Sequence, residues 1–155
     1  MNARIWFLAF FLIVAGAVSS AQVIIDEKGL YHNEDNELYT GTYIEFYPNG
    51  NKKIEITLKE GVLNGPVTIY FESGVKNEVR SYANGAMDGT WTTWNEEYVK
   101  IAEANYKNGV KQGDWFIWDD AGTLRFEMHY INGKKTGIWK MFDENGELVS
   151  EEKKE

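Results

Sequence analysis

The sequence predicts an all-β fold, an antiparallel meander of about ten short strands built from five tandem 24-residue β-hairpin repeats in a single twisted or curled sheet. Three observations predict it. One glycine recurs every 24 residues. Asn-Gly and Pro-Asn-Gly turns separate runs of aromatic and β-branched residues, as in β-hairpins. Polar and apolar residues alternate along the second half of most units, as in strands with one dry face.

The first element in the chain is a predicted signal peptide at residues 1–21. A short basic start is followed by an apolar run from Ile5 to Val18 and by the small residues of a cleavage site. The alternative is an uncut membrane anchor, but about 14 apolar residues are short for a span, which needs ~20. The chain contains no cysteine, so it is not a lipoprotein. We therefore expect an exported protein, either periplasmic or secreted.

Residues 22–33 form a lead-in segment, whose apolar residues we expect to form a strand covering the first edge of the sheet. The repeat domain follows at residues 34–155, with units at 34–57, 58–81, 82–105, 106–129 and 130–153. In the fourth unit we expect one strand at 114–118 and a returning strand at 123–130. On the returning strand, one side is expected to carry Leu124, Phe126, Met128 and Tyr130. The second unit departs from this pattern, because three charged residues fall on the expected dry side, namely Lys76, Glu78 and Arg80.

The repeated columns supply the candidate functional residues. We assign a structural role to the glycines, because glycine permits unusual backbone geometry and close packing; they are Gly41, Gly65, Gly89, Gly113 and Gly137. We give the same role to the tryptophans two residues later, Trp91, Trp115 and Trp139. A second aromatic row lies five residues after the glycines and is the candidate binding surface: Phe46, Tyr70, Trp94, Trp118 and Phe142. Three residues of spacing predict that the two rows face opposite sides of the sheet, unless a bulge intervenes. The alternative is that both rows only stabilise the sheet and that neither binds a partner.

The composition and the motifs exclude several function classes. The formal net charge is −8 at pH 7, which argues against binding to nucleic acid and to anionic membranes. We expect no enzymatic activity, no cofactor and no metal site. The chain lacks cysteine, and its two histidines, His32 and His129, lie in unrelated positions. A column of glutamates, Glu55, Glu103, Glu127 and Glu151, is expected to pair with lysine or arginine on the sheet surface.

The motifs Asn108–Trp118 (NGVKQGDWFIW), Asn132–Phe142 (NGKKTGIWKMF) and Asn84–Trp94 (NGAMDGTWTTW) resemble the MORN repeat, in the variant form common in bacteria. The resemblance covers residues 34–153, and the first unit is a degenerate or capping one. It implies a repeat module that binds other proteins. Bacterial members are often described as antitoxins, so neutralisation of a toxin is a second hypothesis. A third is binding of an envelope glycan by the tryptophan row. The oligomeric state is left open.

Overall fold

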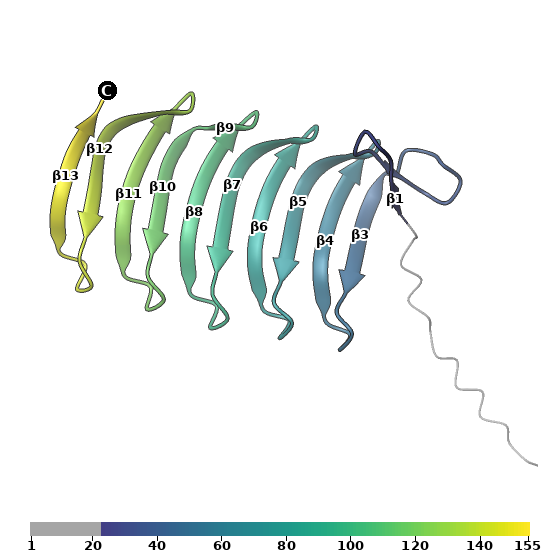
Figure 1. Cartoon of the computed structure of the whole chain (residues 1–155), viewed down its shortest axis with the longest axis horizontal. Helices are drawn as coiled ribbons and strands as arrows, with labels where there is room; N and C mark the ends of the chain where they lie inside the picture. The colour runs from purple at the N-terminus through teal and green to yellow at the C-terminus, as the bar shows by residue number, and fades with distance from the viewer. Residues whose placement is uncertain (1–22) are drawn as a thin grey trace, which may run out of the picture.

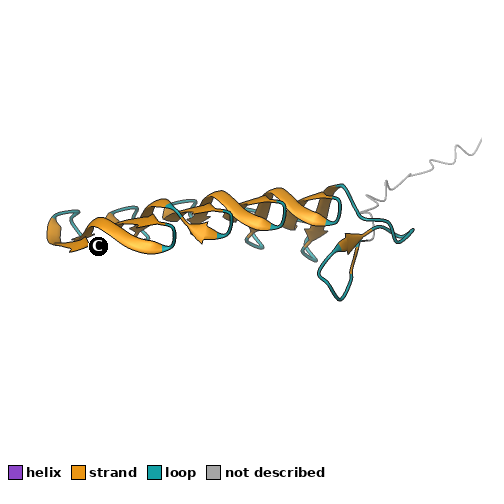
Figure 2. Ribbon diagram, turned by 90° about the horizontal axis from the view of Figure 1, so that it is seen from above, coloured by secondary structure: helices purple, strands orange, loops and turns teal. Residues whose placement is uncertain are grey.

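The computed structural model describes residues 23–155, so the predicted signal peptide lies outside the described residues. An open antiparallel sheet runs in chain order from β3 to β13, with neighbouring strands pointing in opposite directions (Figure 1). Seen along its edge, the sheet is a single layer (Figure 2). The predicted all-β meander is confirmed. Its strands are β3 (Gly41–Phe46), β4 (Lys52–Lys59), β5 (Val62–Tyr70), β6 (Lys76–Ala83), β7 (Ala86–Trp94), β8 (Lys100–Lys107), β9 (Val110–Lys111), β10 (Gly113–Trp118), β11 (Leu124–Ile131), β12 (Lys134–Phe142) and β13 (Leu148–Lys154).

The Asn-Gly turns join strands along one end of the sheet. Asn84 and Gly85 both have positive φ, 49° and 82°, as a type I′ hairpin requires. Asn108-Gly109 and Asn132-Gly133 repeat this geometry, and Glu60 takes the asparagine position in the first such turn at φ 50°. These turns connect the returning strand of each unit to the first strand of the next unit.

A second kind of turn closes the opposite end of each hairpin. In the fourth unit the Asp119 carboxylate accepts the backbone N–H groups of Ala121 and Thr123, at 3.1 and 2.9 Å. Asn95 plays the same role in the third unit through its side-chain oxygen, and Asp143 does so in the fifth. These side chains mimic a backbone turn and fix the loop.

These turns predict acid sensitivity. Hydrogen bonding from the Thr123 N–H lowers the pKa of Asp119, and the Glu147 N–H does the same for the pKa of Asp143. A lowered folded pKa gives stability that is present above the unfolded pKa of about 3.9 and is lost as pH falls through the folded value. We expect the urea midpoint of the wild type to fall between pH 5 and pH 3. The double variant Asp119→Asn/Asp143→Asn keeps both acceptors, as Asn95 does, and should lose less. Equal losses in the two proteins would contradict this assignment.

The repeated glycine marks an irregularity within each long strand. Ile56 pairs with Val67 and Leu58 pairs with Leu63, so β5 holds two more residues than β4 across this stretch. Gly65 lies there at φ 126°, and a Cβ on it would be 3.0 Å from Thr57 Cγ2. In the fourth unit the same irregularity ends β9, and β10 begins at Gly113. The predicted structural role of this glycine therefore has a specific geometric basis.

A smaller bulge corrects two sequence-based expectations. Ile117 pairs with Phe126 but Trp118 pairs with Leu124, which leaves Arg125 as an extra residue. Paired residues share a face, so Leu124 lies on the opposite face from Phe126, and the prediction that they point the same way is wrong. In the second unit the equivalent bulge is at Asn77. It pairs Lys76 with Tyr70, so Lys76 lies on the face of Tyr70 and not on the face of Glu78, as the alternation had predicted.

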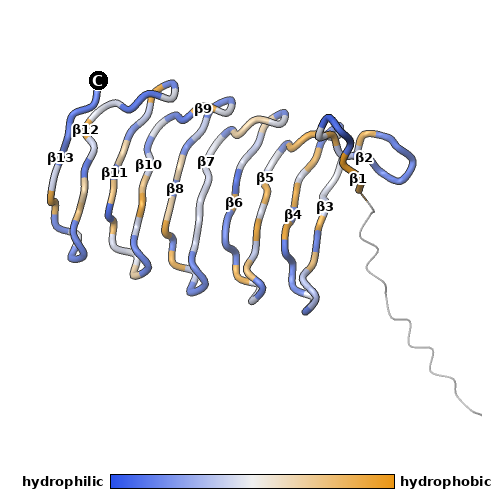
Figure 3. The backbone as a smooth tube through the Cα atoms, in the orientation of Figure 1, coloured by the Kyte–Doolittle hydropathy of each residue, from blue (hydrophilic) through white to orange (hydrophobic). Residues whose placement is uncertain are grey.

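The cluster of most buried residues lies in the first two units, and Tyr130 is buried separately in the fifth. Ile56, Leu58 and Val67 form the core cluster, with 7%, 2% and 5% of their surfaces exposed. Figure 3 shows hydrophobic stretches in β4 and β5, in contrast to the largely hydrophilic β13. Arg80 pairs across the strands with Val67 of this cluster and forms an ion pair of 2.7 Å with Glu78. They remain on the predicted dry side because each neutralises the other's charge there.

The lead-in segment differs from its prediction. Its strands β1 (Ile24–Ile25) and β2 (Tyr31–His32) pair with each other in a separate hairpin beside the sheet (Figure 2). They do not pair with the edge strand β3, so the expectation of an edge-covering strand is wrong. Instead Tyr31 packs against the core cluster, and its N–H donates to the carbonyl of Gly61. The segment therefore covers the first Asn-Gly-type turn.

Each turn is also bonded to the unit before it. The N–H of Gly85 donates to the Leu63 carbonyl at 2.8 Å, and the N–H of Asn84 donates to the Asn64 side chain at 3.0 Å. The spacings of 22 and 20 residues recur at every such turn. The side chains that accept these bonds are of different types, and each does so through an oxygen atom. They are Thr40, Asn64, Asp88 and Gln112. We call these paired bonds the turn latch.

Candidate binding face

The two aromatic rows lie on opposite faces of the sheet, as their spacing predicts. Along β10, Phe116 and Trp118 are in contact with ring centroids 5.6 Å apart, whereas Trp115 contacts Tyr106 and Tyr130. The bulge lies on the returning strand β11, so it leaves the alternation of β10 intact. We call the side with Trp91, Trp115 and Trp139 the tryptophan face. The opposite side, with Glu55, Glu103 and Glu127, is the glutamate face.

A continuous aromatic ladder crosses the tryptophan face. Its rings follow the order Trp91, Tyr106, Trp115, Tyr130 and Trp139, with successive centroids 5.0 to 5.8 Å apart. Tilted and edge contacts of this kind stabilise aromatic pairs beyond the area they bury. The indole N–H groups of Trp115 and Trp139 donate to the carbonyls of Asn105 and His129. The ladder therefore ties units three to five together.

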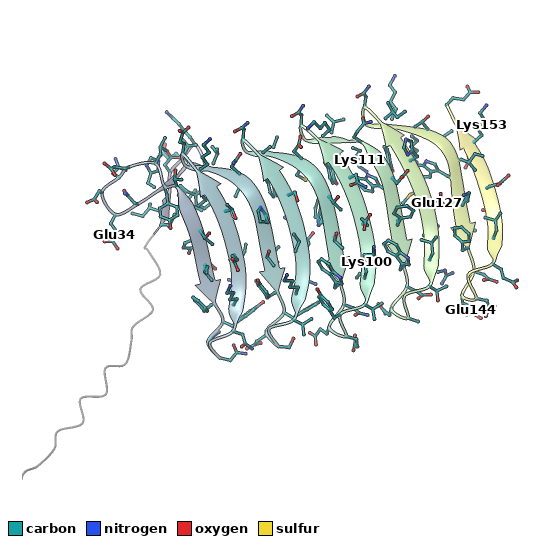
Figure 4. All side chains as sticks on the ribbon, turned by 180° about the vertical axis from the view of Figure 1, so that it is seen from behind. Glu34, Lys100, Lys111, Glu127, Glu144 and Lys153 are labelled. Atoms are coloured by element: carbon teal, nitrogen blue, oxygen red, sulfur yellow. The ribbon has the colours of Figure 1, made fainter. Side chains whose placement is uncertain are left out.

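Cationic side chains lie against the tryptophan rings. Arg80 is 4.4 Å from the centroid of Trp91, Lys111 is 4.2 Å from that of Trp115, and Lys135 is 4.5 Å from that of Trp139. Figure 4 shows Lys111 toward the end of the strands that carries the Asn-Gly turns. Within residues 23–155, no carboxylate pairs with Lys111 or Lys135. The tryptophan face thus carries positive charge in an acidic protein.

A hollow of about 220 Å³ opens between Trp91 and Trp115. Its remaining lining residues are Thr93, Ala102, Ala104 and Tyr106. The two alanines create the space, since β8 pairs Ala104 with Trp91 and Ala102 with both Thr93 and Ile117. Other units carry larger residues in these columns, such as Phe126 and Met128.

An exposed apolar row continues from the hollow. Ile117, Phe126 and Met141 pair in sequence across β10, β11 and β12, and are 40%, 39% and 37% exposed. Contiguous exposed apolar side chains mark interaction surfaces more often than scattered ones do. The hollow and this row therefore form one candidate surface on units three to five.

The glutamate face is more polar. Glu55, Glu103 and Glu127 pair with Lys52, Lys100 and Lys140 at 2.6 to 3.1 Å, so these three predicted surface pairs are present. The bond from Lys52 lowers the pKa of Glu55. Lys100 Nζ also lies 4.4 Å from the Trp118 centroid, and Figure 4 shows this lysine toward the end opposite Lys111.

The predicted binding row lies on this glutamate face. Phe46 is 44% exposed, and the other four members are half-buried. Trp94 stacks on Tyr98 and lines an open cavity of about 590 Å³, whose rim holds Glu96, Glu97 and Asp120. The structure therefore places one shallow cavity by the predicted row, and the more apolar hollow beside tryptophans that the sequence analysis treated as structural.

Sequence reasoning missed the hollow and the exposed row. The sequence signal for the hollow was a pair of alanines at positions 102 and 104, where the neighbouring units have Glu78 and Arg80 or Phe126 and Met128. In the described part of the chain, residues 23–155, no group of three metal-ligating side chains comes together and no helix is long and apolar enough to cross a membrane.

The repeating hairpins were compared with models of known protein families. Three segments of the chain match the MORN repeat variant. The matched residues are 39–60, 111–132 and 135–153. They include residues 39–57 of the first unit, which the sequence predicts to be a degenerate or capping repeat. MORN repeats are non-catalytic modules that generally bind proteins or membrane lipids. No curated protein matches the chain.

Proposed function

We propose that this protein is a non-enzymatic, exported repeat module that binds another protein through its tryptophan face. The observation that carries the proposal is the exposed row Ile117, Phe126 and Met141, which is continuous with the hollow between Trp91 and Trp115. Repeat arrays commonly use one extended face for binding. Export rests on the pattern of residues 1–21.

A protein partner fits this surface better than a glycan or an anionic membrane. The polar side-chain groups of the lining are the hydroxyl groups of Thr93 and Tyr106 and the indole N–H groups of Trp91 and Trp115, so it offers few partners for the hydroxyls of a sugar. An anionic membrane would meet a chain with a net charge of −8. A toxin that this protein neutralises is one candidate partner, consistent with the antitoxin description of bacterial MORN proteins, and an envelope component is another.

A cross-linked pull-down with residues 22–155 as bait, applied to envelope and secreted fractions, tests the proposal. The double variant Ile117→Lys/Phe126→Lys adds charge to the tryptophan face. The matched control, Ile138→Lys/Leu148→Lys, alters residues of similar exposure, 51% and 52%, on the glutamate face. Both variants should melt close to the wild type, because exposed positions tolerate charge.

We expect the tryptophan-face variant to lose the captured protein and the control to keep it. The purified pair should then form a complex on a sizing column, and the identity of the partner separates a toxin from an envelope component. Equal capture by both variants would overturn the proposal. Loss only with Trp94→Ala/Trp118→Ala would assign binding to the predicted row on the glutamate face instead.

A further inference from the structure

The hollow has the size and the lining of a pocket for a single side chain. An apolar protein cavity of about 150 Å³ can hold a benzene molecule. The hollow, at about 220 Å³, therefore has room for a phenyl group or a branched aliphatic group. Its two walls are tryptophan rings, and aromatic side chains pack well against such walls. An apolar pocket on a binding surface commonly receives the anchor residue of a protein partner.

A cation lies over each of the two tryptophan rings that line the hollow, although neither Arg80 nor Lys111 is itself a lining residue. Arg80, at the Trp91 wall, is already neutralised by Glu78. Lys111, at the Trp115 wall, has no acidic partner within residues 23–155. Its Nζ instead lies over two rings, 4.2 Å from the centroid of Trp115 and 4.9 Å from that of Tyr130. A carboxylate that approached this wall would therefore meet a cation free to pair with it.

From these observations we infer that the hollow receives one aromatic or branched aliphatic side chain of the partner, and that this side chain is flanked by a carboxylate that pairs with Lys111. The inference rests on the proposed function and names the chemistry of the partner's contact segment. It also accounts for the alanines, because larger residues in these columns would fill the pocket.

Small probes test both parts of the inference directly. N-acetyl-phenylalanine supplies the ring and a carboxylate, N-acetyl-phenylalaninamide supplies the ring without the charge, and methyl glucoside stands in for a glycan. Saturation-transfer NMR and tryptophan fluorescence report their binding to residues 22–155. The variant Ala102→Phe/Ala104→Met fills the hollow with the residues that the fourth unit carries in the same columns. Lys111→Gln removes only the charge.

We expect both phenylalanine probes to bind the wild type and the glucoside not to bind. The carboxylate probe should bind about two- to fivefold more tightly than the amide, the range that an exposed ion pair supplies. Lys111→Gln should remove this difference, and Ala102→Phe/Ala104→Met should weaken both phenylalanine probes at least tenfold. Equal affinity of the two probes, binding unaffected by filling the hollow, or stronger binding of the glucoside would overturn the inference.

The pull-down separates failure of this inference from failure of the proposed function. If Ile117→Lys/Phe126→Lys abolishes capture but Ala102→Phe/Ala104→Met does not, the tryptophan face binds the partner without using the hollow. If neither variant changes capture, the proposed function fails as well. If Ala102→Phe/Ala104→Met melts far below the wild type, the smaller change Ala102→Val takes its place. We expect this variant to lose part of its affinity for the probes.

Discussion

Replacing Leu58 by alanine should lower the free energy of unfolding by about 2–5 kcal/mol, the range for truncating a buried leucine. Leu58 is the most buried side chain of the core cluster at 2% exposure, and it packs with Ile56 and Val67. A single-layer sheet has few buried positions, so little other buried surface compensates for the stability lost at Leu58. Urea denaturation followed by tryptophan fluorescence measures it.

Leu148 provides the matched control for this prediction. The same change, Leu148→Ala, removes the same atoms from a side chain that is 52% exposed on β13. We expect it to cost less than about 0.5 kcal/mol, as most surface substitutions do. Similar losses at the two positions would mean that the stability of the array does not depend on the cluster around Leu58.

Replacing Gly65 by alanine should have the second large effect, and Gly113→Ala should have a smaller one. At Gly113 the backbone has φ 90° and an added Cβ would meet only ordinary contacts, so we expect the cost of strain alone, about 1–3 kcal/mol. At Gly65 an added Cβ would also press on Thr57, at 3.0 Å from Cγ2 and 3.1 Å from Cβ. This contact should add about 1–3 kcal/mol.

A double-mutant cycle separates the two costs at Gly65. Thr57→Gly removes the atoms that the new Cβ would meet, so Gly65→Ala should cost less in that background than in the wild type. The remaining cost should match that of Gly113→Ala. If Gly65→Ala lowers the free energy of unfolding as much in the Thr57→Gly background as in the wild type, backbone strain explains the whole effect.

The sequence allowed accurate prediction of the strands and turns, because the period of 24 residues and the Asn-Gly pairs specify them locally. The direction of Leu124 was mispredicted because the single extra residue at Arg125 reverses the alternation, and nothing local in the sequence marks it. The turn latch was not predicted, because its acceptors are chemically different residues in neighbouring units, such as Asn64 and Asp88.

The candidate site was less accessible to prediction than the fold. The opposite facing of Trp115 and Trp118 follows from strand geometry and is confirmed. The candidate binding face was identified from the hollow, whose shape depends on the volumes of side chains from β7, β8 and β10. The hollow needs the small size of Ala102 and Ala104 together with the separation of two tryptophans, and that combination appears only when the strands are placed side by side. The binding role assigned to the Trp118 row stays a prediction.

The turn latch has a consequence for how such a chain can grow. Every latch joins two successive amides to oxygens 20 and 22 residues earlier, respectively, and the donor and acceptor positions recur every 24 residues. Duplication of the third, fourth or fifth unit would therefore present each new turn with a matching acceptor and extend the aromatic ladder. An insertion of another length within a strand would leave amides unpaired and shift side chains between the faces. Hydrogen bonding at the turns thus favours gain or loss of strands in whole repeat units.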